Sequence, residues 1–375
     1  MDLVVLKTGL KIHKSRRDFI TSFVFALICT RSVQFPDLSK KLNDDVEDAS
    51  NLRRIQSFIA TYDLNYLQIA IYLSCFLPKG KWRLSIDRTN WQVGETKHNI
   101  LAITAHCRGV GVPLLFELLD NNGGNSNQSQ RIKIFDKFIQ VFGKDCIECI
   151  IGDREFIGQK WYKYLLKSTI TFYIRIKNNH FVEKDGLRQY AQKWVYPKRK
   201  RCLLDVMITG CKVNIALKKI NKLDKKGKKE NLLIITNSDP KNAIAMYSSR
   251  WSIEVFFQSL KGRGFKLETT HLQDIVSLKK LFALVCIAFV TCLKVGIWRH
   301  ENAKPIPMKN HGYKAKSFFR HGLDTIENSI RRIHQKKTLL DDIIQMLIEQ
   351  IEKKIIEVNI RWITLKWKDL KTYAN

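Results

Sequence analysis

The strongest constraint on the fold is a series of short apolar segments that begins at Trp82 and alternates with helix-like segments. Three segments rich in β-branched and aromatic residues come first, and a turn at Arg108–Gly111 separates the second from the third. An Asn/Gly/Ser-rich loop leads into a helical segment from about Arg131 to Phe142. A buried strand, a second helical segment around Gln159–Leu166 and a further strand follow. The predicted strands read WRLSIDRTNW, NILAITAHC, VPLLFELLD, CIECIIGD and ITFYIRIK.

This order of three strands, helix, strand, helix and strand is expected of a ribonuclease-H-like core, a mixed sheet with helices on both faces. Other segments flank or interrupt it. We predict an α/β protein with a helical N-terminal region at 1–80 and a ribonuclease-H-like catalytic core at 81–177 and 241–273. A β-rich insertion is predicted at 178–240, from the runs CLLDVMITG, CKVNIALKKI and NLLIITNS, and a helical C-terminal region at 274–375.

The charge of the chain points to a polyanionic partner. Lys and Arg outnumber Asp and Glu by 65 to 35, a formal net charge of +30. Nucleic acid is the commonest such polyanion, and it binds cationic surfaces with strong salt dependence. The uncharged stretch Leu281–Leu293 is shorter than the roughly 20 residues that a membrane span needs. We therefore predict a DNA partner, no membrane, and a cytoplasmic, nucleoid-associated location.

Two interpretations of the N-terminal region remain open, and a third, an export signal, is disfavoured. In residues 1–80, a helix-turn-helix-like DNA reader and a plain helical bundle predict the same apolar spacing. The segment from Ser15 through Arg16-Arg17 to Cys29 looks like a twin-arginine export signal. It has no small-residue cleavage site, and a basic amphipathic first helix explains the same residues.

The nine cysteines do not form a disulfide or zinc pattern. Their odd number in a large chain indicates free thiols in a reducing compartment. Cys146 and Cys149 have C-x-x-C spacing, but no second pair or two histidines follow nearby. They also lie in a predicted strand, where residues three apart point to opposite faces. The pattern therefore disfavours a zinc site.

Two acids lie in strands that should be neighbours in such a sheet: Asp87 in the first strand, which we expect to end near it, and Asp153 at the end of the fourth. Either acid alone would also suit a turn or a helix cap. A third acid, Glu254, lies in the segment Tyr247–Lys261, which contains no helix breaker and is predicted to be helical.

Around Glu254, other polar side chains recur at helical spacing. Tyr247, Arg250, Glu254 and Lys261 follow one another at intervals of three, four and seven, which predicts that they share one helix face. An amphipathic helix with a simple Arg250–Glu254 pair would show the same spacing. A carboxylate flanked by cationic groups, however, also suits a metal ligand with phosphate clamps. Three such carboxylates fit two-ion phosphoryl transfer with Mg²⁺, which prefers oxygen ligands.

These residues carry a resemblance to a known family. Y-x2-R-x3-E-x6-K, complete here, is the signature of the DDE transposases of the insertion-sequence-four group, which are bacterial cut-and-paste elements. IDRTNW around Asp87 and GDREFIG around Asp153 resemble that group's two Asp motifs. HGYKAKSFFRHGLDTI, from His311, is similar to its C-terminal helical segment, and SNLRRIQSFI, from Ser50, to part of its N-terminal domain. The resemblance covers most of the chain and includes an insertion between the second Asp and the Glu.

The resemblance implies a site and partners. Asp87, Asp153 and Glu254 would be the catalytic metal ligands for Mg²⁺, for which Mn²⁺ substitutes. Tyr247, Arg250 and Lys261 would hold phosphates of the transposon end. The partners would be terminal inverted repeats and target DNA, bound by a homodimer on paired ends.

Trp91 is a further DNA-binding candidate, for stacking on a flipped base, as are Trp194 and Tyr196 of the insertion. For each of these three residues, a buried core aromatic is the favoured explanation. We expect a DNA transposase that cleaves transposon ends and transfers the 3′-hydroxyl to target DNA. The alternatives are an inactive or domesticated DNA-binding protein of the same fold and a nuclease that only hydrolyses.

Overall fold

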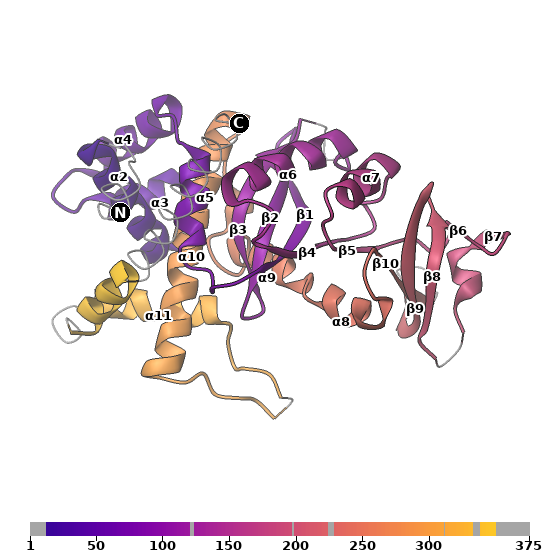
Figure 1. Ribbon diagram of the computed structural model, residues 1–375. Helices are drawn as coiled ribbons and strands as arrows, with labels where there is room; N and C mark the ends of the chain where they lie inside the picture. Colours follow the sequence, from indigo (N-terminus) through magenta and orange to yellow (C-terminus); the bar gives the residue numbers. More distant parts are fainter. Residues whose placement is uncertain are drawn as a thin grey trace, which may run out of the picture. The chain divides into compact units, whose positions relative to one another are not determined.

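The chain forms two compact units in a computed structural model that describes residues 13–120, 124–196, 199–223, 229–310, 312–332 and 338–349. Unit 1 comprises Met1–Leu77 and Gln258–Asn375, and unit 2 comprises Pro78–Phe257 (Figure 1). The ends of the predicted N- and C-terminal regions, 1–12 and 350–375, lie outside the described residues. The four-segment division proposed from the sequence stays a prediction.

Unit 2 is built on one mixed sheet. Its described strands pair in the order β3-β2-β1-β4-β5-β10-β9-β8-β6-β7. β1, β2 and β3 are antiparallel, whereas β4 is parallel to β1 and β5 is parallel to β4. The first five strands therefore have the predicted ribonuclease-H-like arrangement. The strands are β1 (Trp82–Val93), β2 (Thr96–Cys107), β3 (Val110–Leu118), β4 (Ile147–Gly152), β5 (Phe172–Arg175), β6 (Phe181–Lys184), β7 (Leu187–Tyr190), β8 (Arg201–Ile208), β9 (Cys211–Leu223) and β10 (Lys229–Thr236).

Helices flank this sheet on both faces (Figure 1). α6 begins with a capping box in which Asn127 and Gln130 satisfy each other's main-chain amides. On the other face, α8 packs Ala243 and Tyr247 against Cys149 and Ile151 of β4 and against Ile234 of β10. This packing sets the position of Tyr247. The helices are α6 (Gln128–Phe142), α7 (Gln159–Lys167), α8 (Ala243–Ser248) and α9 (Trp251–Leu260), with short 3-10 turns η1 (Ala191–Trp194) and η2 (Pro240–Asn242).

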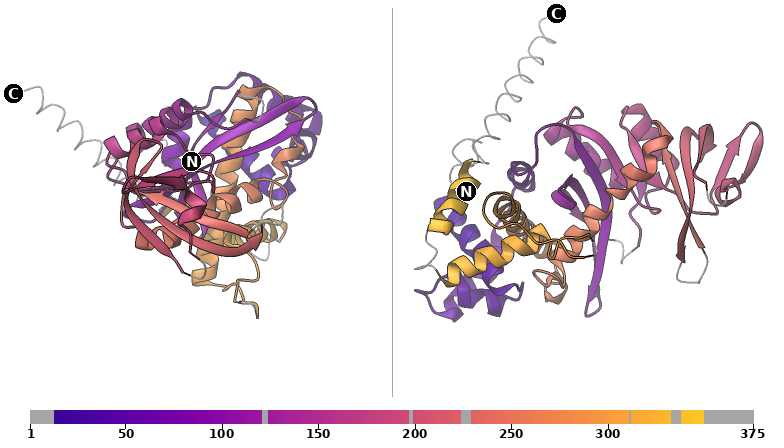
Figure 2. Two further views of the ribbon diagram at one scale, coloured as in Figure 1. Left: turned by 90° about the vertical axis from the view of Figure 1, so that its right-hand side faces the viewer. Right: turned by 90° about the horizontal axis from the view of Figure 1, so that it is seen from below.

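The segment predicted as a β-rich insertion is continuous with the core sheet. The three predicted strands are present as β8, β9 and β10, and the hairpin β6–β7 is additional. β10 pairs antiparallel with β5, so that Ile235 lies opposite Ile174. The chain thus leaves the core after β5 and returns on the adjacent strand (Figure 2).

Unit 1 is helical. It contains α2 (Lys14–Thr30), α3 (Phe35–Leu42), α4 (Asp48–Thr61), α5 (Tyr66–Ser74), η3 (Leu267–Thr269), α10 (Ile275–Asn302) and α11 (Phe318–Arg331). The fully buried Lys280 of α10 donates to the main-chain oxygen of Ile59, near the end of α4, at 2.9 Å. A cation at a helix C-terminus satisfies carbonyls that the helix leaves unpaired.

α10 is the one described helix that by itself has the length and apolar composition of a membrane span, and α2 with α3 passes the same test as a pair bent by 114°. However, 83% of the apolar window of α10 is buried within the protein. α10 therefore has the burial of a core helix, as expected from the sequence for Leu281–Leu293.

α10 and α11 cross in backbone contact at two glycines. A Cβ at Gly296 would overlap the carbonyl oxygen of Phe318, and one at Gly322 would overlap that of Cys292. Only glycine permits this approach, which explains the Gly in the segment HGLDTI.

Candidate functional site

The sheet register brings the first two predicted acids together. Ile86 of β1 and Gly152 of β4 are partners in a parallel pair. Asp87 and Asp153 are the next residue on each chain, so they lie side by side at the point where β4 ends. Alternation along β1 and β4 places both on the face that α8 covers, because Ile151 packs against α8.

The expectation that the first strand ends near Asp87 is wrong. β1 continues to Val93, and Asp87 lies in mid-strand opposite Ala102 of β2. The hairpin with β2 supplies ladder bonds beyond the point where β4 stops. Each Asp is oriented by the amide that follows it: Arg88 N donates to Asp87 Oδ1 at 2.8 Å, and Arg154 N donates to Asp153 Oδ1 at 2.6 Å.

The segment Tyr247–Lys261 is not one continuous helix, so the prediction of a single helical face is wrong. α8 ends at Ser248, a turn at Ser249 and Arg250 follows, and α9 begins at Trp251. In the turn, Arg250 N bonds Tyr247 O at 3.0 Å and Ile253 N bonds Arg250 O at 3.1 Å, which is tighter, 3-10-like spacing. The break changes the direction of the Arg250 side chain, while Tyr247 packs on the sheet.

Arg250 occupies the centre of the site. Its Nη1 donates to Asp87 Oδ2 at 3.2 Å, and its Nη2 pairs with Glu254 Oε1, one turn on. Its guanidinium carbon lies 5.6 Å from the centre of the Tyr247 ring. The Tyr247 hydroxyl donates to Asp153 Oδ1 at 3.3 Å. Five of the predicted site residues therefore meet in one cluster.

Burial governs the ionisation of this cluster. It raises the pKa of Asp87 to about 7, although Arg250 and the Arg88 amide lower that pKa, while Asp153 and Glu155 raise it further. Burial alone would lower the pKa of Arg250, but Tyr247 and the acids raise it above its ordinary value, so the guanidinium stays charged. Burial also raises the pKa of Tyr247 to about 12, which keeps its hydroxyl a donor.

The donor set fits a hard divalent cation in its chemistry. The three carboxylates of the cluster, those of Asp87, Asp153 and Glu254, offer the oxygen ligands that Mg²⁺ prefers. Within the described residues, no three acidic, His or Cys side chains are near enough to hold an ion as they stand. The guanidinium of Arg250 supplies the positive charge between Asp87 and Glu254.

Lys261 and Trp91 are placed differently from these five residues. Lys261 lies just after α9, within unit 1, where its Nζ pairs with Glu268 at 2.7 Å. Trp91 shares the face of Asp87 in β1 but lies four residues further on, about 13 Å along the strand. It is partly buried, with its ring 5.3 Å from that of His98. The sequence alone does not show these surroundings.

Sequence reasoning missed two residues that fix the helix break. His106 in β2 lies near the main chain of Ser249, which raises the pKa of His106, whereas burial lowers that pKa overall. A Cβ at Gly111 of β3 would lie 2.7 Å from Thr104 Oγ1 and 3.1 Å from Ser252 O. Gly111 therefore allows the start of α9 to approach the sheet closely. Neither residue has a local motif that would reveal this role.

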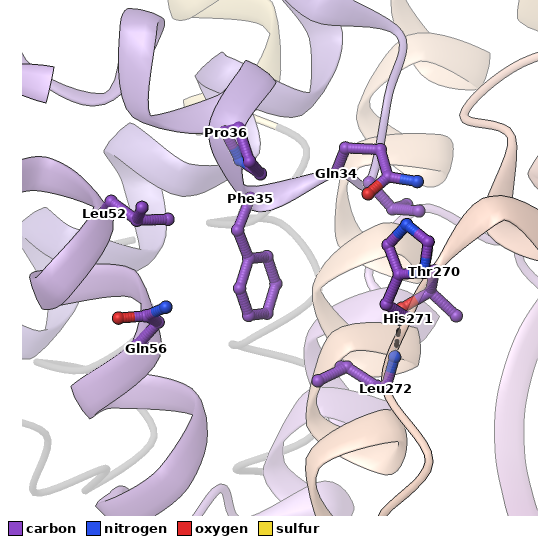
Figure 3. A pocket seen from close by; sticks show the side chains of 9 residues that line it. Gln34, Phe35, Pro36, Leu52, Gln56, Thr270, His271 and Leu272 are labelled. Atoms are coloured by element: carbon purple, nitrogen blue, oxygen red, sulfur yellow. Dashed lines mark hydrogen bonds between the residues drawn. The ribbon is translucent and has the colours of Figure 1, made fainter. Parts of the chain in front are cut away.

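A separate pocket of about 220 Å³ lies within unit 1. In Figure 3 the ring of Phe35 points into it, between Leu52 and Gln56 of α4 and the chain at Thr270–Leu272. A hydrogen bond of 3.3 Å from Leu272 N to Thr270 Oγ1 shapes that wall. None of the predicted catalytic, metal-binding or DNA-binding residues lines this pocket.

A family model described as "Transposase DDE domain" matches residues 78–291, more than half of the chain. No curated protein matches the chain. Among solved structures, the chain is similar to the cryo-EM structure of a piggyBac transposase synaptic complex with hairpin DNA. That similarity has a TM-score of 0.44 and 14% identity, and it covers 91% of this chain and 80% of the other.

Proposed function

The chain belongs to the DDE transposase domain family, and from this membership we propose that it is the transposase of a bacterial insertion element of the insertion-sequence-four group. It would cut DNA at the ends of its element and join the freed 3′-hydroxyl to target DNA, by a cut-and-paste route. The complete Y-x2-R-x3-E-x6-K signature supports the group assignment.

One observation carries the proposal: acids from three separate elements meet around Arg250 and Tyr247. Asp87 and Glu254 contact the Arg250 guanidinium, and Asp153 accepts from the Tyr247 hydroxyl, whose ring lies against that guanidinium. Burying acids together costs free energy unless a positive charge accompanies them. The raised pKa of Asp87 reflects that cost. A cluster of this kind is suited to bind divalent ions rather than to stabilise the fold.

In this proposal Asp87, Asp153 and Glu254 hold divalent ions, with Mg²⁺ as the natural ion and Mn²⁺ as its substitute. The bound ions would activate the attacking oxygen and stabilise the leaving one. Tyr247, held between Asp153 and the sheet, would donate its hydroxyl to a phosphate oxygen. Arg250 would turn its guanidinium from the acids to the phosphate, for which its planar fork is suited.

The remaining assignments rest on the resemblance and on charge. Lys261 would contact a phosphate of the transposon end, and Trp91 would stack on an extruded base. The net charge of +30 suits DNA along its length. A homodimer on paired terminal inverted repeats would be the active unit, and a cytoplasmic, nucleoid-associated location follows from the substrate.

The test uses the DNA that flanks the gene, because it supplies the terminal repeats. A labelled duplex of one repeat is incubated with the full chain and Mg²⁺, and 3′-end nicking is measured. Pre-cleaved ends with a supercoiled target are then supplied to detect joined product. Nicking with joining supports the transposase, nicking without joining indicates a hydrolysing nuclease, and binding without nicking contradicts the enzyme assignment.

A further inference from the structure

A partly buried ion pair lies beside Asp87 and Asp153. Arg88 follows Asp87 in β1, and Glu155 comes two residues after Asp153. Arg88 Nε donates to both carboxylate oxygens of Glu155, at 2.8 and 2.9 Å. The two side chains are only 11% and 16% exposed. An Nε contact to both oxygens of a carboxylate restricts the orientation as well as the distance of the partners.

The rest of the guanidinium is also held in place. Arg88 Nη1 donates to Asn99 Oδ1 of β2 at 2.7 Å, and Nη2 donates to Asn125 Oδ1, in the loop before α6, at 3.0 Å. Ser126 Oγ donates to Glu155 Oε1 at 3.2 Å. Two further elements therefore hold the pair: β2 and the loop before α6.

The position of the pair matters because the β1–β4 register ends at Ile86 and Gly152. Beyond that point, the Arg88–Glu155 pair connects the two chain segments. The amides of Arg88 and Arg154, which orient Asp87 and Asp153, belong to those segments. The orientation of each acid thus depends on backbone that the ion pair holds.

We propose, on the basis of the proposed function, that Arg88 and Glu155 are positioning residues: their ion pair sets the separation at which Asp87 and Asp153 bind divalent cations. Ions in two-metal sites lie about 4 Å apart, which leaves little tolerance in the spacing of the ligands. Arg88 and Glu155 do this from the chain beside the acids and contact neither ion nor DNA. Loss of partners that orient metal ligands typically weakens metal binding by about 10–100-fold.

The chain contains a matched control. Arg83 and Glu148 also join β1 to β4, with Arg83 Nε at 2.9 and 3.0 Å from the two Glu148 oxygens. This pair lies four residues before Asp87 and five before Asp153, within the ladder. It therefore makes the same connection without holding the backbone that orients the acids.

The experiment measures Mn²⁺ binding to the full chain without DNA, from the electron paramagnetic resonance signal of free Mn²⁺. Arg88→Gln and Glu155→Gln are each expected to weaken Mn²⁺ binding about tenfold or more. The double variant is expected to bind Mn²⁺ no more weakly than the single variant with the lower affinity. Arg83→Gln and Glu148→Gln are expected to stay within about threefold of the unsubstituted chain. Arg88→Lys, which keeps the charge but loses the fork, is expected to weaken binding as well.

Asn125→Ala covers the case in which the substitutions of the ion pair do not fold, because it removes the Nη2 contact by changing an exposed loop residue. A smaller loss of affinity, about threefold or more, is expected. Unaltered Mn²⁺ affinity in Arg88→Lys and Asn125→Ala, or an equal loss in the Arg83–Glu148 control, overturns the positioning role alone. A chain without any substitution that binds no Mn²⁺ overturns the proposed function itself, and this inference with it.

Discussion

At the scale of single residues, the positive charge at the centre of the site is the guanidinium of Arg250. Arg250 reaches Asp87 and Glu254, while Tyr247 reaches Asp153. The signature spacing predicted that Arg250 and Glu254 would meet, since they are one turn apart. The spacing did not reveal that Arg250 also reaches Asp87, because that contact depends on the fold.

Substitution of any one acid tests the assignment of the ligands. Asp87→Asn, Asp153→Asn and Glu254→Gln are each expected to reduce 3′-end nicking by about a thousandfold or more, since each would remove a proposed ion ligand. Binding to the terminal repeat should change little. Gel-based nicking and band-shift assays measure the two quantities. Glu148→Gln is the control acid; normal nicking by any one of the three variants would mean that its acid is wrongly assigned.

Removal of the positive charge of Arg250 should have opposite effects on divalent-ion binding and on DNA nicking. Charge-assisted hydrogen bonds of Arg250 with two acids are worth roughly 1.5–3 kcal/mol each, and an entering ion must displace them. Arg250→Gln is therefore expected to bind Mn²⁺ about tenfold more tightly without DNA, yet to nick DNA more slowly. Titration calorimetry and the nicking assay test this. Weaker Mn²⁺ binding would show that Arg250 does not compete with the ion.

At the scale of elements, the order of strands was predictable because apolar periodicity and turns mark each one. The neighbouring positions of Asp87 and Asp153 followed from that order. The break between α8 and α9 was not predictable, because Ser249 and Arg250 carry no helix-breaking chemistry. Contacts from His106 and across Gly111, both distant in sequence, accompany the break. The pairing of β10 with β5 likewise depends on tertiary contacts.

The crossing of α10 and α11 predicts a steric effect. Gly322→Ala would place a Cβ against the Cys292 carbonyl, which forces the helices apart. Overpacking of this kind costs typically 1–3 kcal/mol, so we expect a loss of about that size in the free energy of unfolding. Urea denaturation measures it. Gly262→Ala, with open space around its Cβ, serves as the control; equal stability of the two variants would contradict the close crossing.

A pH-dependent contact joins α2 to α11. Arg31 Nη2 lies 2.9 Å from Asp324 Oδ1, and Lys316 Nζ lies 2.9 Å from Oδ2. Burial alone would raise the pKa of Asp324. The hydrogen bond and charge of Lys316, with the charges of Arg320 and Arg31, lower it below the ordinary 3.8. The stabilisation is therefore present above about pH 4 and is lost as the pH falls through the lowered pKa.

Asp324→Asn should thus cost about 1 kcal/mol of unfolding free energy at pH 7, since the pair is partly exposed. That difference should shrink as the pH is lowered below the ordinary pKa of 3.8, because the native carboxyl becomes protonated as the pH falls through its lowered pKa. Urea midpoints at neutral pH and at such a lower pH provide the measurement. Asp45→Asn, at an exposed turn between α3 and α4, is the reference. A destabilisation that is equal at both pH values would exclude the ionised carboxylate as its cause.

At the scale of the whole molecule, the net charge of +30 predicts how DNA affinity depends on salt. If six to ten phosphates are neutralised, the affinity for the terminal repeat should fall by about 10³–10⁵-fold between 50 and 200 mM salt. Fluorescence anisotropy over that range gives the slope. Asp87→Asn should show the same slope, since it leaves the cationic surface unchanged. An affinity that hardly depends on salt would contradict binding through the phosphates.

The chain leaves the core sheet after β5 and returns on β10, the strand next to it. This arrangement has a consequence for evolution and for protein engineering. Because β10 pairs with β5, the two ends of the intervening segment are anchored on adjacent strands. Residues between them can lengthen, shorten or be exchanged without changing the register of β1 and β4, where the acids lie. Sequence differences among homologous chains should therefore collect in this segment. A foreign module grafted between the two strands should leave the arrangement of Asp87 and Asp153 intact.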